Sequence, residues 1–168
     1  SPFLDFNQSK VEKLFSYLVA KAVSRISTYS KINGALSPAY AESIHKKHHG
    51  EWDFNLDWKP IKGFPTYFMW VVAIAEAQKK LKHSNITVPI LVIHSAHSSK
   101  VSKFSEEAMS KDIVLNIEDI KRVGQELGDK VTLMKIENAQ HDIFLSPKEV
   151  REAAFEKMFF WLKEKGTN

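Results

Sequence analysis

The sequence predicts an α/β fold in its second half and a block of helices in its first half. Two apolar runs of strand length, VPILVIHS at 88–95 and KVTLMKIE at 130–137, alternate there with two segments of helical periodicity. That alternation is typical of a parallel sheet whose strands are joined by helices. Because two strands alone do not make a stable sheet, we expect them to need neighbouring strands from outside this chain.

Two long helices are expected in the first half. The first spans residues 9–29, where apolar side chains recur at helical spacing. Ser9 and Glu12 have the pattern of a capping box, in which each side chain accepts a hydrogen bond from the other residue's backbone N–H. The other long helix spans residues 66–83, apolar at its start and basic at its end, which is the order that the helix dipole favours.

A shorter helix is expected between them, over residues 36–50. Ser37 is a suitable cap, Pro38 fits the first turn, and Gly50 is suited to the end of the helix. The following residues, 51–65, are rich in aromatic side chains and are interrupted by two prolines and a glycine. They are therefore expected to form a loop.

The second half contains two further expected helices. One spans residues 117–127, with Ile117, Ile120, Val123 and Leu127 on one face and Gly128 past its end. The closing helix spans 146–166, with Ser146 as its cap and Pro147 in its first turn. Its spacing predicts a buried side formed by Val150, Phe155, Met158, Phe159 and Leu162.

Length and composition narrow the class of protein. At 168 residues, with 43% hydrophobic and 26% charged residues, the chain suits one globular domain rather than a disordered segment. The net charge of +4 includes no basic stripe interleaved with aromatic residues, so we expect no nucleic-acid partner. The absence of cysteine excludes disulfides and thiol catalysis and is typical of a reducing compartment, so we expect a cytoplasmic protein. The longest apolar run, 67–75, is nine residues, well short of the roughly 18 that span a membrane.

Polar residues with catalytic potential follow the two expected strands. His141 lies after the strand at 130–137, and Asp112 lies in the long loop after the strand at 88–95. Because functional groups gather at the carboxyl ends of parallel strands, these two side chains are expected to meet. The Asp112 carboxylate would then accept a hydrogen bond from one ring nitrogen of His141, leaving the other nitrogen to act as a general base.

The same residues also have simpler structural interpretations. His141 alone is equally typical of a hydrogen-bonded loop histidine, and Asp112 alone of a solvated acid near a helix start. Asp142 is expected to bond the local backbone rather than the His141 ring. His94 ends the buried strand, and we expect it to hydrogen-bond within the core.

A metal site is conceivable at His45, His48 and His49, which would share one helix face if the helix over 36–50 is continuous. The sequence offers no convincing fourth ligand there, and intervening lysines would repel a cation. We therefore favour a solvated helix end and expect neither a metal nor an organic cofactor.

The aromatic residues of the central loop and the helix after it permit two interpretations. They form packing for the helical block, or they line an apolar pocket for an acyl group. The residues considered for that pocket are Trp52, Phe54, Trp58 and Phe64.

These segments together resemble the C-terminal half of an α/β-hydrolase, of the bacterial serine aminopeptidase and lysophospholipase-like group. VPILVIHS resembles the strand before that family's acid loop, DIVLNIEDIKRVGQELG its acid turn and following helix, and IENAQHDIFLS its histidine turn. The resemblance implies a helical cap over residues 1–84 and the end of the sheet over 85–168. It implies that His141 is the general base and Asp112 the acid of a Ser-His-Asp triad.

The resemblance also implies a part that these residues do not contain. The family's nucleophilic serine stands in a G-x-S-x-G turn, and no such pattern occurs in the chain. We therefore expect a small carboxylic ester or related acyl substrate, a serine from outside this chain, and no turnover by the chain alone. The alternative is a non-catalytic α/β module that pairs through its sheet edge with a second copy or with the missing half.

Overall fold

A computed structural model describes residues 1–32, 37–82 and 84–165. The ends of the expected ranges at 36, 83 and 166 lie outside these residues. The elements are, in chain order, α1 (Lys10–Ile26), β1 (Lys31–Ile32), α2 (Pro38–Glu42), β2 (Thr66–Tyr67), α3 (Phe68–Leu81), β3 (Ile90–Ser95), α4 (Glu107–Ser110), α5 (Ile117–Gln125), β4 (Val131–Ile136), the 3-10 turn η1 (Ile143–Leu145) and α6 (Lys148–Lys165).

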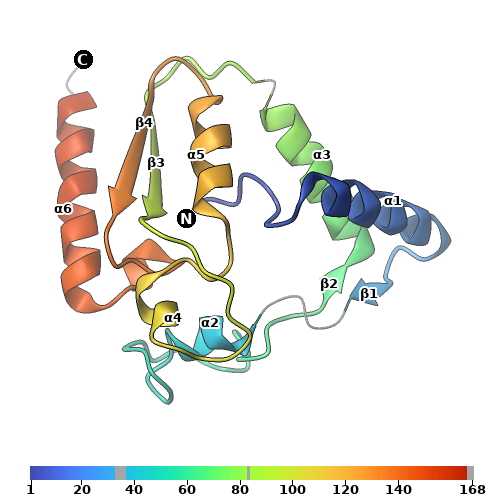
Figure 1. Cartoon of the computed structure of the whole chain (residues 1–168), viewed down its shortest axis with the longest axis horizontal. Coiled ribbons are helices and arrows are strands. Elements are labelled where there is room, and N and C mark those ends of the chain that lie inside the picture. Colours follow the sequence, from blue (N-terminus) through green and yellow to red (C-terminus); the bar gives the residue numbers. More distant parts are fainter. Residues whose placement is uncertain (33–36, 83, 166–168) are drawn as a thin grey trace.

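The second half is built around a parallel pair of strands. β3 and β4 run side by side in register from Ile90 opposite Val131 to Ser95 opposite Ile136. Figure 1 shows α5 and α6 on opposite sides of this pair. The expected strand–helix–strand–helix order is therefore confirmed. Among the described residues β3 pairs with β4 alone, so its other edge carries unpaired backbone groups.

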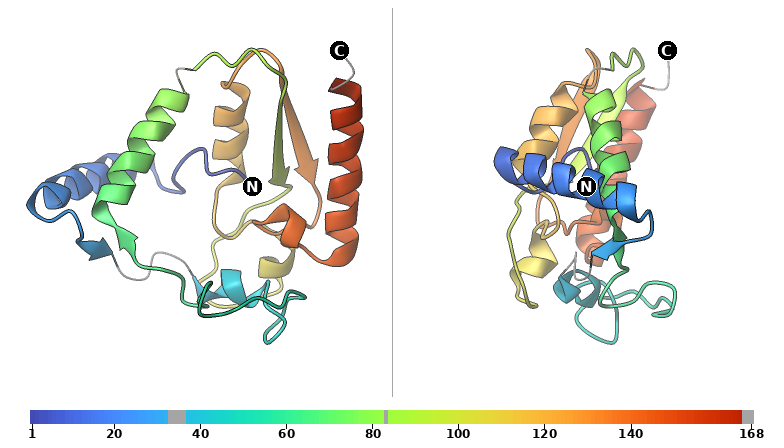
Figure 2. Two further views of the ribbon diagram at one scale, coloured as in Figure 1. Left: turned by 180° about the vertical axis from the view of Figure 1, so that it is seen from behind. Right: turned by 90° about the vertical axis from the view of Figure 1, so that its right-hand side faces the viewer.

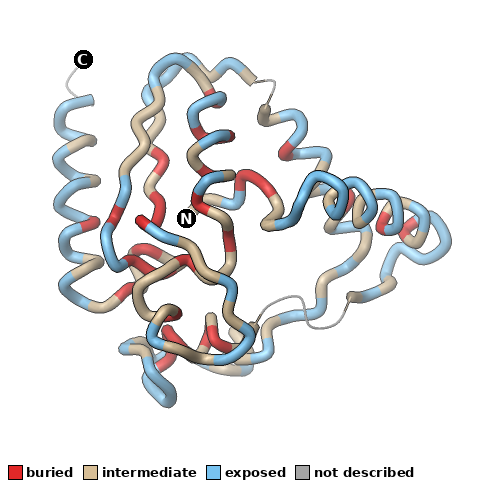
Figure 3. The backbone as a smooth tube through the Cα atoms, in the orientation of Figure 1, coloured by how far each residue is buried: buried red, intermediate tan, exposed pale blue. Residues whose placement is uncertain are grey.

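The apolar side chains of the strands alternate between two buried clusters, as the two-residue period of a strand requires. Val92 of β3 packs toward α5, where it joins a core whose other buried members are Leu4, Leu115, Ile120, Val123 and Leu127. Ile93 packs on the opposite side against the second cluster, formed by Ile136, Ala139, Ile143 and Ala154. Figure 3 shows the buried residues gathered around the strands and the loops at their carboxyl ends.

The helices α1 and α3 extend away from this core as a second region. α1 packs along α3, and the short antiparallel pair β1–β2 joins them at one end. Figure 2 shows these helices on the side of the molecule remote from α6. Much of α1 is apolar yet exposed; Val11 has 77% and Phe15 68% of its surface accessible.

Several sequence expectations are confirmed by these elements. The capping box of α1 forms as expected, with Ser9 and Glu12 each accepting from the other's backbone N–H. Ser37 caps α2 by accepting from the Ala39 N–H. Within the described ranges no helix is long and apolar enough to cross a membrane.

Two expectations are wrong. The helix over 36–50 ends at Glu42 instead, because the chain turns back so that Trp52 N–H bonds the Ile44 carbonyl. Gly50 lies inside that turn, where a Cβ would stand only 2.0 Å from the Ile44 carbonyl carbon. In α6 none of the five residues of the expected apolar face is fully buried, because two strands cover too little of so long a helix; the buried residue of α6 is Ala154, which was not expected there. The exposed members of that face are Phe155, Phe159 and Leu162.

Candidate active site

The backbone of Asp112 is held next to the end of β3. Its N–H donates to the His97 carbonyl at 2.9 Å, and its own carbonyl accepts from the Ser99 N–H at 3.0 Å. These bonds form a parallel bridge that continues the direction of β3 beyond its last residue. The loop between Ser99 and Asp112, which carries α4, therefore begins and ends at the same point, just beyond the end of β3.

The Asp112 side chain is fully buried and is oriented by the turn that follows it. Oδ1 accepts from the backbone N–H of Val114 at 2.9 Å and of Leu115 at 2.8 Å. Asn116 then caps α5 by accepting from the Glu118 N–H at 2.9 Å. The carboxylate is consequently fixed by the start of α5 rather than free to rotate.

His141 stands on the turn that follows β4, and this turn is braced from both sides. Ser95 Oγ donates to the Ala139 carbonyl at 2.7 Å, and the Gln140 N–H donates to Ser146 Oγ at 2.9 Å. Asn138 takes a left-handed conformation, with φ of 55°, where the chain leaves the strand. Asparagine tolerates this region better than most residues, so the sharp turn is encoded locally.

The two side chains meet as the sequence predicts. His141 Nδ1 lies 3.0 Å from Oδ2 and 3.1 Å from Oδ1 of Asp112. The imidazole keeps 16% of its side-chain surface accessible, whereas the carboxylate has none. An Nδ1–H that donates to Asp112 fixes the tautomer in which Nε2 carries a lone pair.

Burial and the contacts of the carboxylate shift the pKa of Asp112 in opposite directions. Burial favours the neutral form and raises the pKa of Asp112, but the hydrogen bond and charge of His141 and the Leu115 N–H outweigh it. The pKa of Asp112 is therefore lower than the ordinary value of a carboxyl group. The acid stays ionised at neutral pH and can stabilise a positive charge on the imidazole.

The remaining ring nitrogen of His141 is not taken up by another contact. Within the described residues Nε2 has no hydrogen-bond partner, and His141 lines a cavity of about 870 Å³ between the core and the helices α1 and α3. The lining of this cavity includes the apolar side chains of Phe6, Phe15, Trp70 and Val71. The base can thus reach a reacting group held among apolar side chains.

Asp142 behaves differently from the expectation that it bonds the local backbone. Its carboxylate accepts a short hydrogen bond from the hydroxyl of Tyr40, and Lys59 Nζ lies 3.8 Å away. Tyr40 belongs to α2, and its ring stands edge-on to the ring of His141 with centroids 5.5 Å apart. Sequence reasoning missed this contact because Tyr40 precedes Asp142 by 102 residues and no local pattern links them.

The aromatic residues considered for an acyl pocket are distributed over different environments. Trp58 and Phe64 line a cavity of about 600 Å³. Phe54 packs edge-on against His45, and the Trp52 indole N–H donates to the Leu145 carbonyl at 2.8 Å. Their role in binding an acyl group stays a prediction.

The histidines considered for a metal are not arranged on one helix face, because α2 ends before them. His45 is buried, and its Nε2 lies 3.0 Å from the Phe54 carbonyl. The described residues contain no cluster of three or more histidine or carboxylate side chains suited to a metal. His94 is buried and bonds the Ser95 carbonyl at 2.7 Å, as expected for a core residue, and burial lowers its pKa.

Comparison with solved structures identifies the fold. A monoacylglycerol lipase from Paleococcus ferrophilus superposes with a TM-score of 0.62 and 18% identity, over 96% of this chain and 55% of the lipase. The chain has part of an α/β-hydrolase fold. A soluble variant of the Saccharomyces cerevisiae monoglyceride lipase, solved with a substrate analogue, matches with a TM-score of 0.54 and 13% identity, over 93% of this chain and 47% of that one.

The chain thus spans about half the length of these lipases. No family model and no curated protein matches its sequence. The expected fold class is confirmed by the two structures, and at these identities the likeness concerns the fold alone.

Proposed function

We propose that this chain supplies the base, the acid and the cap of a Ser-His-Asp hydrolase that acts on carboxylic esters or related acyl substrates. The observation that carries the proposal is the hydrogen bond between His141 Nδ1 and the buried Asp112 carboxylate, at the carboxyl ends of β3 and β4. In an open parallel sheet this is where reacting groups gather. The α/β-hydrolase fold of the relatives, both lipases, supports the same class of reaction.

The proposed reaction assigns one task to each side chain. His141 Nε2 takes the proton of a serine hydroxyl as the oxygen attacks the ester carbonyl, and later returns a proton to the leaving oxygen. Asp112 holds the imidazole in the required tautomer and stabilises its charged form. The acyl group would occupy the cavity of about 870 Å³ that His141 lines.

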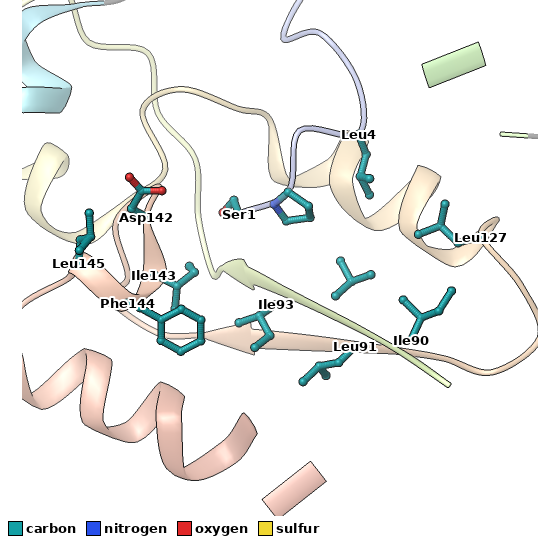
Figure 4. A pocket seen from close by; sticks show the side chains of 12 residues that line it. Ser1, Leu4, Ile90, Leu91, Ile93, Leu127, Asp142, Ile143, Phe144 and Leu145 are labelled. Carbon is teal, nitrogen blue, oxygen red and sulfur yellow. The ribbon is translucent and has the colours of Figure 1, made fainter. Parts of the chain in front are cut away.

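The serine would come from outside these 168 residues, because the chain contains no G-x-S-x-G pattern. The unpaired edge of β3 is suited to a further parallel strand from the Ser-bearing segment. Figure 4 shows a hollow along this edge, where Ile93 of β3 stands beside Ile143 and Phe144 and Leu91 lies further along the strand. Apolar side chains next to unpaired backbone groups favour strand addition.

The experiment compares hydrolysis of p-nitrophenyl butyrate by the chain alone and by the chain joined to its Ser-bearing segment. We expect no turnover by the chain alone. We expect the assembled protein to be active and His141→Ala to lower its kcat by about 10⁴-fold or more, because triad residues act as a unit. Turnover by the chain alone that His141→Ala abolishes would contradict the proposed origin of the serine.

The exposed edge also favours a second candidate function, a non-catalytic module that pairs through β3. The two candidates differ in what His141 does, since a binding module has no use for the base. An assembled protein that binds its partner normally but hydrolyses no ester, before or after His141→Ala, would favour the binding module.

A further inference from the structure

A second cavity lies in the cap beside the one that His141 lines. It has a volume of about 600 Å³, within the range of small-molecule sites, and among the described residues it shares Thr66 and Trp70 with the larger cavity. The shared residues lie on β2 and the first turn of α3. The two cavities therefore adjoin at these residues.

Aromatic side chains dominate the lining of this second cavity. They are Tyr40, Trp58, Phe64, Tyr67 and Trp70. Trp58 leaves 81% of its surface accessible and Phe64 leaves 63%, so their ring faces are not covered by other parts of the described chain. Exposed indole and phenyl faces at one concave site favour a flat, apolar ring as ligand.

One corner of the cavity is polar, and this corner adjoins the base. Lys59 Nζ donates to the Tyr40 hydroxyl oxygen at 3.2 Å and lies 3.8 Å from the Asp142 carboxylate. An ammonium group has three donors, so Lys59 retains capacity for a further acceptor. The centroid of the Tyr40 ring stands 5.5 Å from that of the His141 ring, so Tyr40 links this donor to the base.

An ester has two sides, and a hydrolase must accommodate both across the reacting carbonyl. The cavity that His141 lines is available to the acyl side. We propose that the aromatic cavity binds the alcohol side, and that the alcohol is a primary alcohol carrying a flat ring system. This inference rests on the proposed function, and it adds the class of leaving group.

The proposed arrangement gives the leaving oxygen both a proton donor and a positioning residue. As the acyl carbon–oxygen bond breaks, protonated His141 gives its Nε2 proton to the leaving oxygen, and the neutral alcohol forms. Lys59 donates a hydrogen bond to that oxygen at the polar corner, while the ring stacks among Trp58, Phe64 and Trp70. Lys59 acts as a positioning residue for the leaving group.

The test measures binding of the alcohol product without any need for turnover. The chain has four tryptophans, and two of them serve as internal controls. Trp58 and Trp70 line the aromatic cavity, whereas the indole N–H groups of Trp52 and Trp161 bond the Leu145 carbonyl and Thr132 Oγ1 elsewhere. In ¹⁵N-labelled protein assembled with its Ser-bearing segment, each indole signal is assigned by a Trp→Phe substitution.

Addition of 2-naphthylmethanol is expected to shift the Trp58 and Trp70 indole signals saturably and to leave those of Trp52 and Trp161 in place. Hexan-1-ol, which has the hydroxyl but no ring, should bind at least tenfold more weakly. Trp58→Ala should weaken binding at least fivefold, while the control Phe160→Ala, on the exposed face of α6, should not change it. A Trp58 signal that does not shift, or equal affinity for hexan-1-ol and 2-naphthylmethanol, would overturn the proposal.

A kinetic measurement separates this inference from the proposed function. The specificity ratio kcat/KM for 2-naphthylmethyl butyrate over ethyl butyrate should fall at least fivefold in Trp58→Ala, and an unchanged ratio would count against the aromatic site. If neither ester is hydrolysed while Trp58 still responds to the alcohol, the proposed function fails and the aromatic binding site stands.

Discussion

The core region around β3 and β4 and the proposed cap, which is the described part of residues 1–84, are held in different ways. The side chains that meet in the core, Asp112 and His141, are fixed by backbone hydrogen bonds of the turns that carry them. The cap instead joins the core through long-range side-chain contacts, such as that of Tyr40 with Asp142. The difference teaches that the acid–base geometry is fixed by the turns at the ends of β3 and β4, whereas the shape of the pocket depends on side-chain contacts between the two regions.

A cluster of ion pairs around Asp5 shows the second kind of contact. This buried carboxylate lies 3.0 Å from Lys13 of α1, 3.2 Å from Lys82 after α3, and 2.9 Å from Arg122 of α5. One acid thereby ties both long cap helices to the core helix. Within the described residues no strand pairing joins this region to β3 and β4, because β1 and β2 pair with each other.

The largest expected effect concerns the acid of the core. Asp112→Asn keeps an oxygen for the N–H groups of Val114 and Leu115 but no longer holds the reactive tautomer of His141. We expect kcat of the assembled protein to fall by about 10⁴-fold with little loss of stability.

Asp112→Ala provides the matched comparison for that substitution. It leaves the two backbone N–H groups without their acceptor, so it should also lower the free energy of unfolding by about 2–3 kcal/mol. Thermal denaturation and ester kinetics on both variants check this separation. Retention of a tenth or more of kcat by Asp112→Asn would show that the carboxylate does not orient the base.

The next effect compares two leucines, one from each region. Leu127 is 5% exposed in the core beside α5, and Leu14 is 60% exposed on α1. Leu127→Ala should lower the free energy of unfolding by about 3 kcal/mol through the cavity it leaves, and Leu14→Ala by less than about 0.5 kcal/mol. Urea denaturation of each variant measures the difference. Similar losses from both substitutions would mean that Leu14 is covered in solution.

The smallest effect tests the ion pairs between cap and core. Asp5→Asn should lower the free energy of unfolding by roughly 2 kcal/mol. This is less than the loss expected from breaking a fully buried ion pair, because the partner cations are partly exposed. Burial raises the pKa of Asp5, but the hydrogen bonds of Lys13 and Arg122 and the charges of Lys13 and Lys82 lower it below the ordinary value.

The sign of the pH dependence follows from that lowered pKa. The stabilisation by Asp5 is complete above the unfolded-state value of about 4 and is lost as the pH falls through the folded-state value. The stability difference between the wild type and Asp5→Asn should therefore shrink below about pH 4. A difference that stays constant across an acid titration would exclude ionisation of Asp5 as its cause.

The sequence predicted the core region well because its signals are local. Apolar runs of strand length located β3 and β4, and their order along the chain was sufficient to bring Asp112 and His141 together. The pairing of Tyr40 with Asp142 has no such signal, since it depends on how the cap folds over the turn. The predicted length of α2 was wrong, because Gly50 lies in a tight turn against Ile44 and does not end a helix.

The exposed faces of the long helices were missed for a related reason. Helical periodicity identifies the apolar side of α6, but it does not say whether this chain covers that side. Phe159 is 59% exposed because the two strands beneath are too narrow to reach it. Periodicity therefore predicts which side of a helix is apolar, and only the tertiary structure decides how much of it is buried.

The bridge between Ser98 and Asp112 has a consequence for how this protein tolerates change. Because the loop from 99 to 111 is closed at its base by backbone bonds, residues added to it or deleted from it need not displace the carboxylate. At its exposed residues, such as Lys103, the loop is suited to insertions of variable length while the acid keeps its position, whereas the buried Ala108 of α4 is not such a place. It is the natural place at which to attach a label or graft new surface onto the cap-facing side of the molecule.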